Sequence, residues 1–162
     1  MSLYAKTIKL QESLSKKVVQ EDYVGDIMTI GGTDVSYKND VARASSVMLK
    51  IKTLELLEYK ILQSQVVEPY ISGLLMLRES MPILSVLKLL KHDFDVLLVD
   101  GNGRLHPRKC GLACYLGLML DKPVVGVAKS LLCGREEEDN VILDEEILGK
   151  IIEKKKRYHI EC

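Results

Sequence analysis

The spacing of apolar residues predicts helices and strands along most of the first half of the chain. In residues 2–19, leucine, isoleucine and valine recur at roughly helical spacing with lysines between them, which indicates an amphipathic helix. Residues 27–37 change to the alternation of a strand, in which Asp34 points away from the Val35 face. Two further runs, 41–51 and 54–65, favour strands joined by short links and predict an antiparallel meander, although 54–65 also fits a helical period.

The second half of the chain alternates helical and strand patterns. Residues 74–91 predict a buried helix, in which Pro82 should introduce a kink or start a new segment. Short apolar runs at 96–99 and 123–128 predict buried strands, with a helix over 110–120 between them. Residues 135–140 are strongly charged and predict a solvated loop. We expect a terminal helix over 141–162.

This order predicts a mixed α/β fold: three antiparallel strands followed by helix, strand, helix and strand. A right-handed crossover makes the last two strands parallel, and ligands of such sheets bind beyond the carboxyl ends of the strands, where Asp100 lies. The order resembles the ribonuclease H-like fold. That resemblance implies that the first strand lies beside the fourth and parallel to it, so Asp34 and Asp100 are expected to be neighbours.

Length and composition narrow the class of protein. The 162 residues amount to about one domain, and we expect a single domain over 1–162. A content of 47% hydrophobic and 28% charged residues is typical of a soluble globular protein, and no run approaches the roughly 20 apolar residues of a membrane span. Lys and Arg balance Asp and Glu at 23 each, so any anionic partner must be held by a local patch.

The cysteines favour a reducing compartment. They stand at positions 110, 114, 133 and 162, and the first residues lack the apolar core of a signal peptide, so we expect a cytoplasmic protein. A helix that began at His106 would align it with Cys110 and Cys114 as soft-metal ligands. A fourth ligand and a Cys-x-x-Cys pair are both missing, so these cysteines are better interpreted as small core residues.

Three carboxylates, Asp34, Glu79 and Asp100, lie in or beside apolar segments. A buried carboxylate needs a cation, a metal or several N–H donors, and a nearby arginine would satisfy any one of them alone. Hard oxygen ligands that converge on one site suit Mg²⁺ or Mn²⁺. Such an ion lowers the pKa of a bound water and stabilises the leaving oxygen of a phosphodiester, which predicts hydrolytic phosphate chemistry.

The residues after Asp100 offer groups for a phosphate. Glycines 101 and 103 let the backbone approach a ligand closely, although ordinary turn geometry also explains them. His106 and Arg108 supply hydrogen-bond donors, and Lys129, just past a predicted strand, can act as a point charge on the scissile group.

Three segments together resemble the endonuclease V family: GGTDVSY at 31–37, PYISGLLMLRES at 69–80, and 97–134, in the same order. The match extends over about residues 11–134. The resemblance implies a ribonuclease H-like fold and an endonuclease that uses Mg²⁺, with Mn²⁺ as a substitute. Members cut nucleic acid on the 3′ side of a deaminated base, above all hypoxanthine, one nucleotide beyond it.

Carried over position by position, the resemblance also assigns site residues. It implies that Asp34, Glu79 and Asp100 bind the metal and that Lys129 contacts the phosphate near the cut. Tyr70 and Ile71 form a wedge that inserts between bases while the damaged nucleotide is turned out. The hypoxanthine pocket is then lined by Gly73, Leu74, Gly101 and Gly103.

The chain departs from the family pattern at several positions. Ser72 stands where the wedge usually ends in proline, which should loosen this turn, and Asn102 stands where a histidine often separates the two glycines. Members usually carry another acidic or histidine residue near the metals on a C-terminal helix. We expect a shorter C-terminal part here, with His159 as the only late histidine.

The expected partner is nucleic acid containing inosine or deoxyinosine, bound by a monomer. Two alternatives remain open at this point. One is a shortened inosine-binding module with weak or no cleavage. The other is a ribonuclease H-like nuclease with a different base preference.

Overall fold

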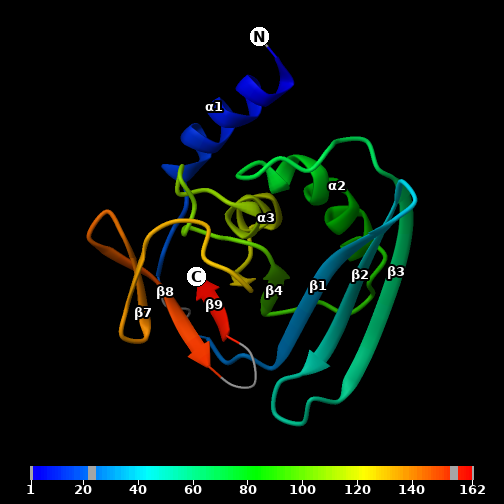
Figure 1. Ribbon diagram of the computed structural model, residues 1–162. Helices are drawn as coiled ribbons and strands as arrows, with labels where there is room; N and C mark the ends of the chain where they lie inside the picture. Colours follow the sequence, from blue (N-terminus) through cyan, green and yellow to red (C-terminus); the bar gives the residue numbers. More distant parts are fainter. Residues whose placement is uncertain (1, 22–24, 154–156, 162) are drawn as a thin grey trace.

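The computed structural model describes residues 2–21, 25–153 and 157–161, with side chains through Ile152 (Figure 1). Its described helices are α1 (Leu3–Ser15), α2 (Leu75–Leu87) and α3 (Leu112–Leu120). Its described strands are β1 (Thr29–Lys38), β2 (Val41–Lys50), β3 (Leu56–Gln65), β4 (Val96–Asp100), β5 (Val124–Ala128), β6 (Arg135–Glu137), β7 (Asn140–Leu143), β8 (Glu146–Glu153) and β9 (Arg157–Glu161).

The strands form one mixed sheet in the order β3-β2-β1-β4-β5-β9-β8-β7-β6. Strands β1, β2 and β3 are an antiparallel meander, and β4 and β5 are parallel to β1, as the sequence predicts. The helical alternative for 54–65 is wrong, because this run is β3. The β1–β4 ladder ends at the pair Thr33–Val99, so Asp34 and Asp100 are the next residues on adjacent parallel strands.

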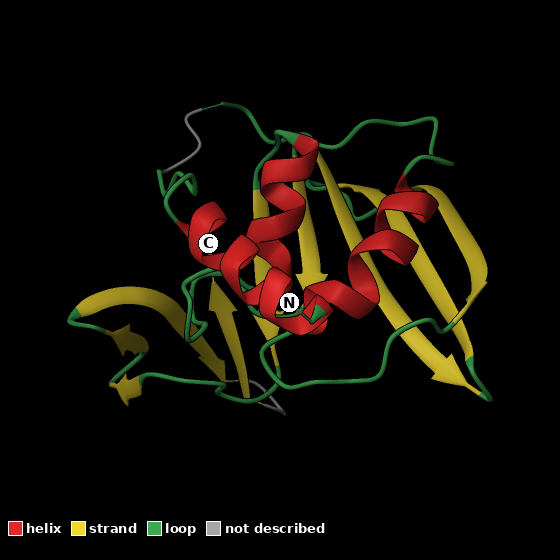
Figure 2. Ribbon diagram, turned by 90° about the horizontal axis from the view of Figure 1, so that it is seen from above, coloured by secondary structure: helices red, strands yellow, loops and turns green. Residues whose placement is uncertain are grey.

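The three helices lie on the same side of the sheet (Figures 1 and 2). Helix α2 contacts β1, β2 and β3, while α3 contacts α2 and β5. The main core fills the space between, with Met48 on β2, Ile83 on α2, Leu97 on β4 and Leu116 on α3 almost completely buried. In β1, Val35 joins this core and Asp34 is exposed on the opposite face, as its alternation predicts.

The described helices differ in detail from their predictions. Helix α1 ends at Ser15, and its buried face includes Thr7 and Gln11, whereas Leu10 is 43% exposed. Helix α2 runs through Pro82, so this proline does not start a new segment. None of the described helices is long and apolar enough to cross a membrane.

Helix α3 begins after Gly111, two residues later than predicted. His106 and Cys110 therefore lie outside it, and the helical alignment of His106 with the two cysteines does not form. Cys110 and Cys114 are buried, form no disulfide and pack near Leu14, as expected of small core residues.

The prediction for residues 135–162 is wrong. The charged loop at 135–140 includes β6 and the start of β7, and the expected terminal helix is replaced by β7, β8 and β9. The β7–β8 hairpin turns at Asp144 and Glu145, both with positive φ (51° and 62°), which is the backbone of a type I′ turn. Strand β9 then pairs with both β8 and β5 and joins the hairpins to the central sheet.

Candidate functional site

The three predicted acids come from three elements that lie near one another beside the carboxyl-terminal end of the central strand β4. Asp34 lies in β1, Asp100 ends β4, and Glu79 lies in α2. Glu79 is only 7% exposed, whereas Asp34 is exposed. Asp34 and Asp100 lie near enough for their negative charges to raise the pKa of Glu79. The fold therefore brings the three acids into one electrostatic environment.

The surroundings of Glu79 raise its pKa. Burial, which disfavours the charged form, is the largest influence and raises the pKa of Glu79 to about 7. The Tyr37 hydroxyl donates a 3.1 Å hydrogen bond to Glu79 Oε1 and opposes this rise, while repulsion from Asp34 and Asp100 adds to it. A cation placed among these carboxylates would relieve the repulsion.

Each acid has a partner within the protein. Asp100 is ion-paired with the Lys129 ammonium, and Asp34 Oδ1 accepts the Val35 N–H at 2.7 Å. With the side chains placed in this way, the part of the chain that the structure describes contains no group of three His, Cys, Asp or Glu residues arranged to hold a metal ion. The chemistry of the three carboxylates fits a hard cation, and metal binding stays a prediction.

A hollow lies beside the acids on the sheet. It has a volume of about 240 Å³ and is lined by residues that include Gly32, Leu98, Asp100, Val127 and Lys129. Lys129 follows directly after β5, and its side chain is largely exposed. An exposed ammonium at the rim of a hollow next to an acidic cluster is suited to hold an anionic group there.

The predicted wedge lies on the loop before α2. Tyr70 is 66% exposed and Ile71 is half-buried. Gly73 follows with φ of 75°, a backbone conformation that favours glycine, and Leu74 is buried at the N-cap of α2. This loop therefore presents one large aromatic side chain to solvent beside a buried anchor.

A smaller cavity of about 50 Å³ opens behind this loop. Its lining includes Tyr70, Gly73 and Asn102, together with Gln11 and His106. Of the four residues expected to line the hypoxanthine pocket, Gly73 lines this cavity. The other three, Leu74, Gly101 and Gly103, lie next in sequence to the lining residues.

The two predicted phosphate donors His106 and Arg108 are engaged inside the protein. His106 is 2% exposed, and its Nε2 lies 2.9 Å from the Gly73 carbonyl oxygen. Burial lowers the pKa of His106 to about 4, so the ring is neutral. Arg108 donates from Nη2 to the same oxygen at 2.6 Å and from Nε to Gln11 Oε1 at 2.8 Å.

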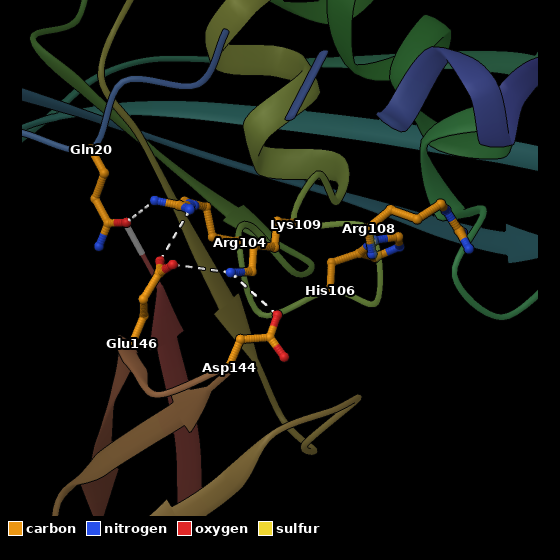
Figure 3. A network of polar contacts seen from close by, with 7 residues as sticks. All are labelled: Gln20, Arg104, His106, Arg108, Lys109, Asp144 and Glu146. Atoms are coloured by element: carbon orange, nitrogen blue, oxygen red, sulfur yellow. Dashed lines mark hydrogen bonds and ion pairs between the residues drawn. The ribbon is translucent and has the colours of Figure 1, made fainter. Parts of the chain in front are cut away.

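The loop that carries His106 also contacts the C-terminal hairpin (Figure 3). Lys109 Nζ lies 3.3 Å from Asp144 Oδ2 and 3.1 Å from Glu146 Oε1, and Arg104 Nη2 lies 3.3 Å from Glu146 Oε2. Figure 3 shows Arg104 and Lys109 directed towards Glu146, with His106 on the other side of the loop. The β7–β8 turn thus fixes one side of the loop.

Comparison with known proteins identifies the family. The family model described as Endonuclease V matches residues 12–159. The chain belongs to the endonuclease V family. The Thermofilum pendens endonuclease V is 42% identical over 127 residues, which are 78% of this chain and 55% of the relative. The chain therefore spans little more than half the length of that relative.

Solved endonuclease V structures share the fold. The enzyme from Streptomyces avermitilis superposes with a TM-score of 0.89 at 25% identity, over 99% of this chain and 77% of that one. The Ciona intestinalis endonuclease V, solved with a 23mer DNA containing an inosine followed by a ribo-adenosine, gives 0.86 at 26% identity, over 98% and 81%. The predicted ribonuclease H-like fold is confirmed.

Sequence reasoning misses several residues that contact or shape the candidate site. Tyr37 and Gln11 were assigned to a strand and a helix without a role. Gly126 was missed as well: a Cβ there would meet the Gly101 carbonyl oxygen at 2.5 Å, so a glycine is needed for the segment after β4 to lie against β5. A glycine inside a strand often marks such close backbone approach, and this was the available signal.

The late residue that the endonuclease V resemblance implies is not assigned. His159 lies in β9, where its backbone pairs with Ala128, the residue before Lys129. Its side chain lies outside the described part of the chain.

Proposed function

We propose that this chain is a metal-dependent endonuclease that cleaves the phosphodiester bond 3′ to a deaminated base, hypoxanthine above all, in DNA and in RNA. The observation that carries the proposal is that Asp34 in β1 and Asp100 at the end of β4 lie near enough to the buried Glu79 for their charges to repel it. Family membership and the inosine-containing DNA bound by the Ciona relative support the substrate class.

Mg²⁺, or Mn²⁺ as a substitute, would be held by the three carboxylates and would lower the pKa of a bound water and stabilise the leaving oxygen. Tyr37 holds the Glu79 carboxylate in position through its hydroxyl. Lys129 is paired with Asp100 and would share its ammonium with a phosphate oxygen of the scissile group.

Recognition of the damaged base is assigned to the loop before α2. The Tyr70 ring, with Ile71 next to it in sequence, would insert between bases as the damaged nucleotide turns out, and its exposure supports this role. Gly73 contributes backbone to the adjoining cavity, and Gly101 and Gly103 flank its lining residue Asn102. A mismatched inosine unpairs at lower cost than a Watson–Crick pair, which adds selectivity.

The first test is Asp100→Ala on an inosine oligonucleotide. We expect Mg²⁺-dependent cleavage to be abolished and binding in Ca²⁺ to be largely kept, because the change removes a metal ligand and leaves the base pocket intact. Glu12→Ala, which removes an exposed acid from α1, is the control. Retained cleavage by Asp100→Ala contradicts the proposal.

Mapping the cut at nucleotide resolution defines the reaction further. Matched deoxyinosine and inosine strands separate DNA from RNA activity, and uracil-containing and undamaged strands test a different base preference. A product one nucleotide beyond the base is expected for deoxyinosine.

A second candidate is an inosine-binding module with weak or no cleavage. The observation that favours it is that Asp100 is paired with Lys129 and that the described acids are not arranged to hold a metal. Tight, inosine-selective binding in a gel assay with Mn²⁺, without product, would establish this module instead.

A further inference from the structure

The backbone carbonyl of Gly73 is held by three side chains. It accepts hydrogen bonds from Gln11 Nε2 at 3.2 Å, from His106 Nε2 at 2.9 Å and from Arg108 Nη2 at 2.6 Å. A carbonyl oxygen has two lone pairs, so three donors saturate it. This oxygen belongs to the residue that joins the Tyr70 loop to α2 and lines the small cavity.

Gln11 connects the donors to each other. Its side chain is completely buried, and its Nε2 also donates to the Cys110 carbonyl oxygen at 2.9 Å. Its Oε1 accepts from Arg108 Nε at 2.8 Å. One amide therefore links α1, the loop before α2 and the segment before α3, which are 62 and 99 residues away in sequence.

His106 is fixed in the state that donates. Its Nδ1 lies 3.2 Å from the backbone N–H of Arg108 and accepts from it, which leaves the proton on Nε2, facing Gly73. A side chain at Gly73 would be strained, because its φ is 75°, and its Cβ would lie 3.1 Å from Arg108 Nη2, so that the guanidinium would have to shift. The backbone conformation of Gly73 thus places its carbonyl oxygen within hydrogen-bond distance of all three donors.

We propose that Gln11 is a positioning residue of the base pocket: with Arg108 and His106 it fixes the Gly73 carbonyl, and through it the Tyr70 loop and the cavity wall. This inference rests on the proposed function. Both ends of the Gln11 amide are engaged within the protein, so Gln11 acts through Gly73. A pocket held in its binding-competent form binds its base more tightly, because affinity falls in proportion to the competent fraction.

The test compares Gln11→Met with Thr7→Val, each a change to an apolar side chain of similar size. Thr7 is a suitable control because it is buried one turn earlier on α1 and its hydroxyl donates a hydrogen bond within that helix, to the Leu3 carbonyl oxygen at 3.0 Å. Steady-state cleavage of a deoxyinosine oligonucleotide with Mg²⁺ is measured for both. For Gln11→Met we expect KM to rise about tenfold and kcat to stay within about twofold.

A second readout is the binding of undamaged oligonucleotide in Ca²⁺. We expect Gln11→Met to leave it unchanged, so that the inosine preference falls about tenfold, while Thr7→Val keeps wild-type KM and preference. Thermal melting measures how far each variant weakens the fold. Should Gln11→Met melt below the assay temperature, Arg108→Lys replaces it, because an ammonium lacks the fork that reaches Gln11 and Gly73 together.

The outcomes separate this inference from the proposed function. A wild-type chain without inosine preference overturns the proposed function and the inference with it. An inosine-selective wild type whose Gln11→Met variant matches Thr7→Val in KM and preference overturns the inference alone. So does an equal loss of affinity for inosine-containing and undamaged strands.

Discussion

The cluster of Asp34, Glu79 and Asp100, called the acidic edge below, and the Gly73 carbonyl differ in how their polar groups are satisfied. At the edge, three like charges share one site, and burial followed by repulsion raises the pKa of Glu79 to about 7. At Gly73, three donors converge on one acceptor and His106 is neutral. A cation bound at the first region would offset this repulsion, which suits chemistry, whereas the second region is a saturated acceptor, which suits rigid recognition.

Glu79→Gln tests the acidic edge and has the largest expected effect. Removal of a proposed metal ligand should lower Mg²⁺-dependent cleavage by on the order of a thousandfold, since metal stabilisation of the transition state amounts to several kcal/mol. In metal-free buffer at pH 8 the same change should raise the free energy of unfolding, by up to about 3 kcal/mol. Cleavage assays and urea unfolding measure the two effects.

The sign of the stability change follows from the raised pKa of Glu79. The folded state binds this proton up to pH about 7 and the unfolded state only up to about 4.5, so wild-type stability falls as pH rises through that window. Glu58→Gln is a control with the opposite sign, because hydrogen bonds from the Lys91 and His92 segment lower the pKa of Glu58 to about 2. A Glu79→Gln variant less stable than wild type at pH 8 would contradict the raised pKa of Glu79, which burial causes first and repulsion from Asp34 and Asp100 second.

His106→Gln tests the satisfied region. The pKa of His106 falls from 6.5 to about 4 on folding, mainly through burial, so between these values the unfolded state binds a proton that the folded state does not. Stability is therefore full above about pH 6.5 and is lost as pH falls towards 4. Between pH 7.5 and 5, wild type should lose about 2 kcal/mol more unfolding free energy than His106→Gln.

Urea unfolding at the two pH values gives this difference, and the other titrating groups cancel between wild type and variant. Gln can still donate to the Gly73 carbonyl, so the cavity wall should be kept. Equal pH dependence of the two proteins would mean that His106 carries a proton in the folded state at pH 5, which contradicts the lowered pKa.

Hydrophobic periods of 2 and 3.6 were enough to predict most helices and strands between β1 and β5, but the pairing of β1 with β4 required the resemblance to a known fold. The prediction of helices and strands failed after Gly134. The apolar residues of β8 stand three and four positions apart, as in a helix: Ile147, Leu148, Ile151 and Ile152. In the structure, however, only Leu148 and Ile151 of these four are buried, and the other two are exposed. The β7–β8 turn uses Asp144 and Glu145 and not the Asn-Gly pair that marks most such hairpins, so its signal was absent.

The candidate site was predictable only in part. Asp34, Glu79 and Asp100 stand out as acids in apolar segments, but their proximity required the resemblance to a fold. Gln11 could not be assigned, because two of its partners are backbone carbonyls, which leave no mark on the residue type, and the third, Arg108, is 97 residues away in sequence. Contacts of this kind depend on tertiary structure and are visible only there.

Tyr37→Phe is the smallest and most selective change at the acidic edge. The Tyr37 hydroxyl donates to Glu79 Oε1 at 3.1 Å, and the Arg78 guanidinium lies 3.9 Å from the centre of the Tyr37 ring. Phenylalanine keeps the ring contact and removes only the hydrogen bond, which contributes about 1 kcal/mol and thus about fivefold in rate. Cleavage should fall by that factor, with a higher Mg²⁺ concentration needed for half-maximal rate. Tyr59→Phe, on the exposed face of β3, should change neither quantity. If Tyr37→Phe keeps both the wild-type rate and the wild-type Mg²⁺ dependence, the Tyr37 hydrogen bond does not position Glu79. The acidic edge would then be held by the fold alone, without a side-chain donor of the kind that holds the Gly73 carbonyl.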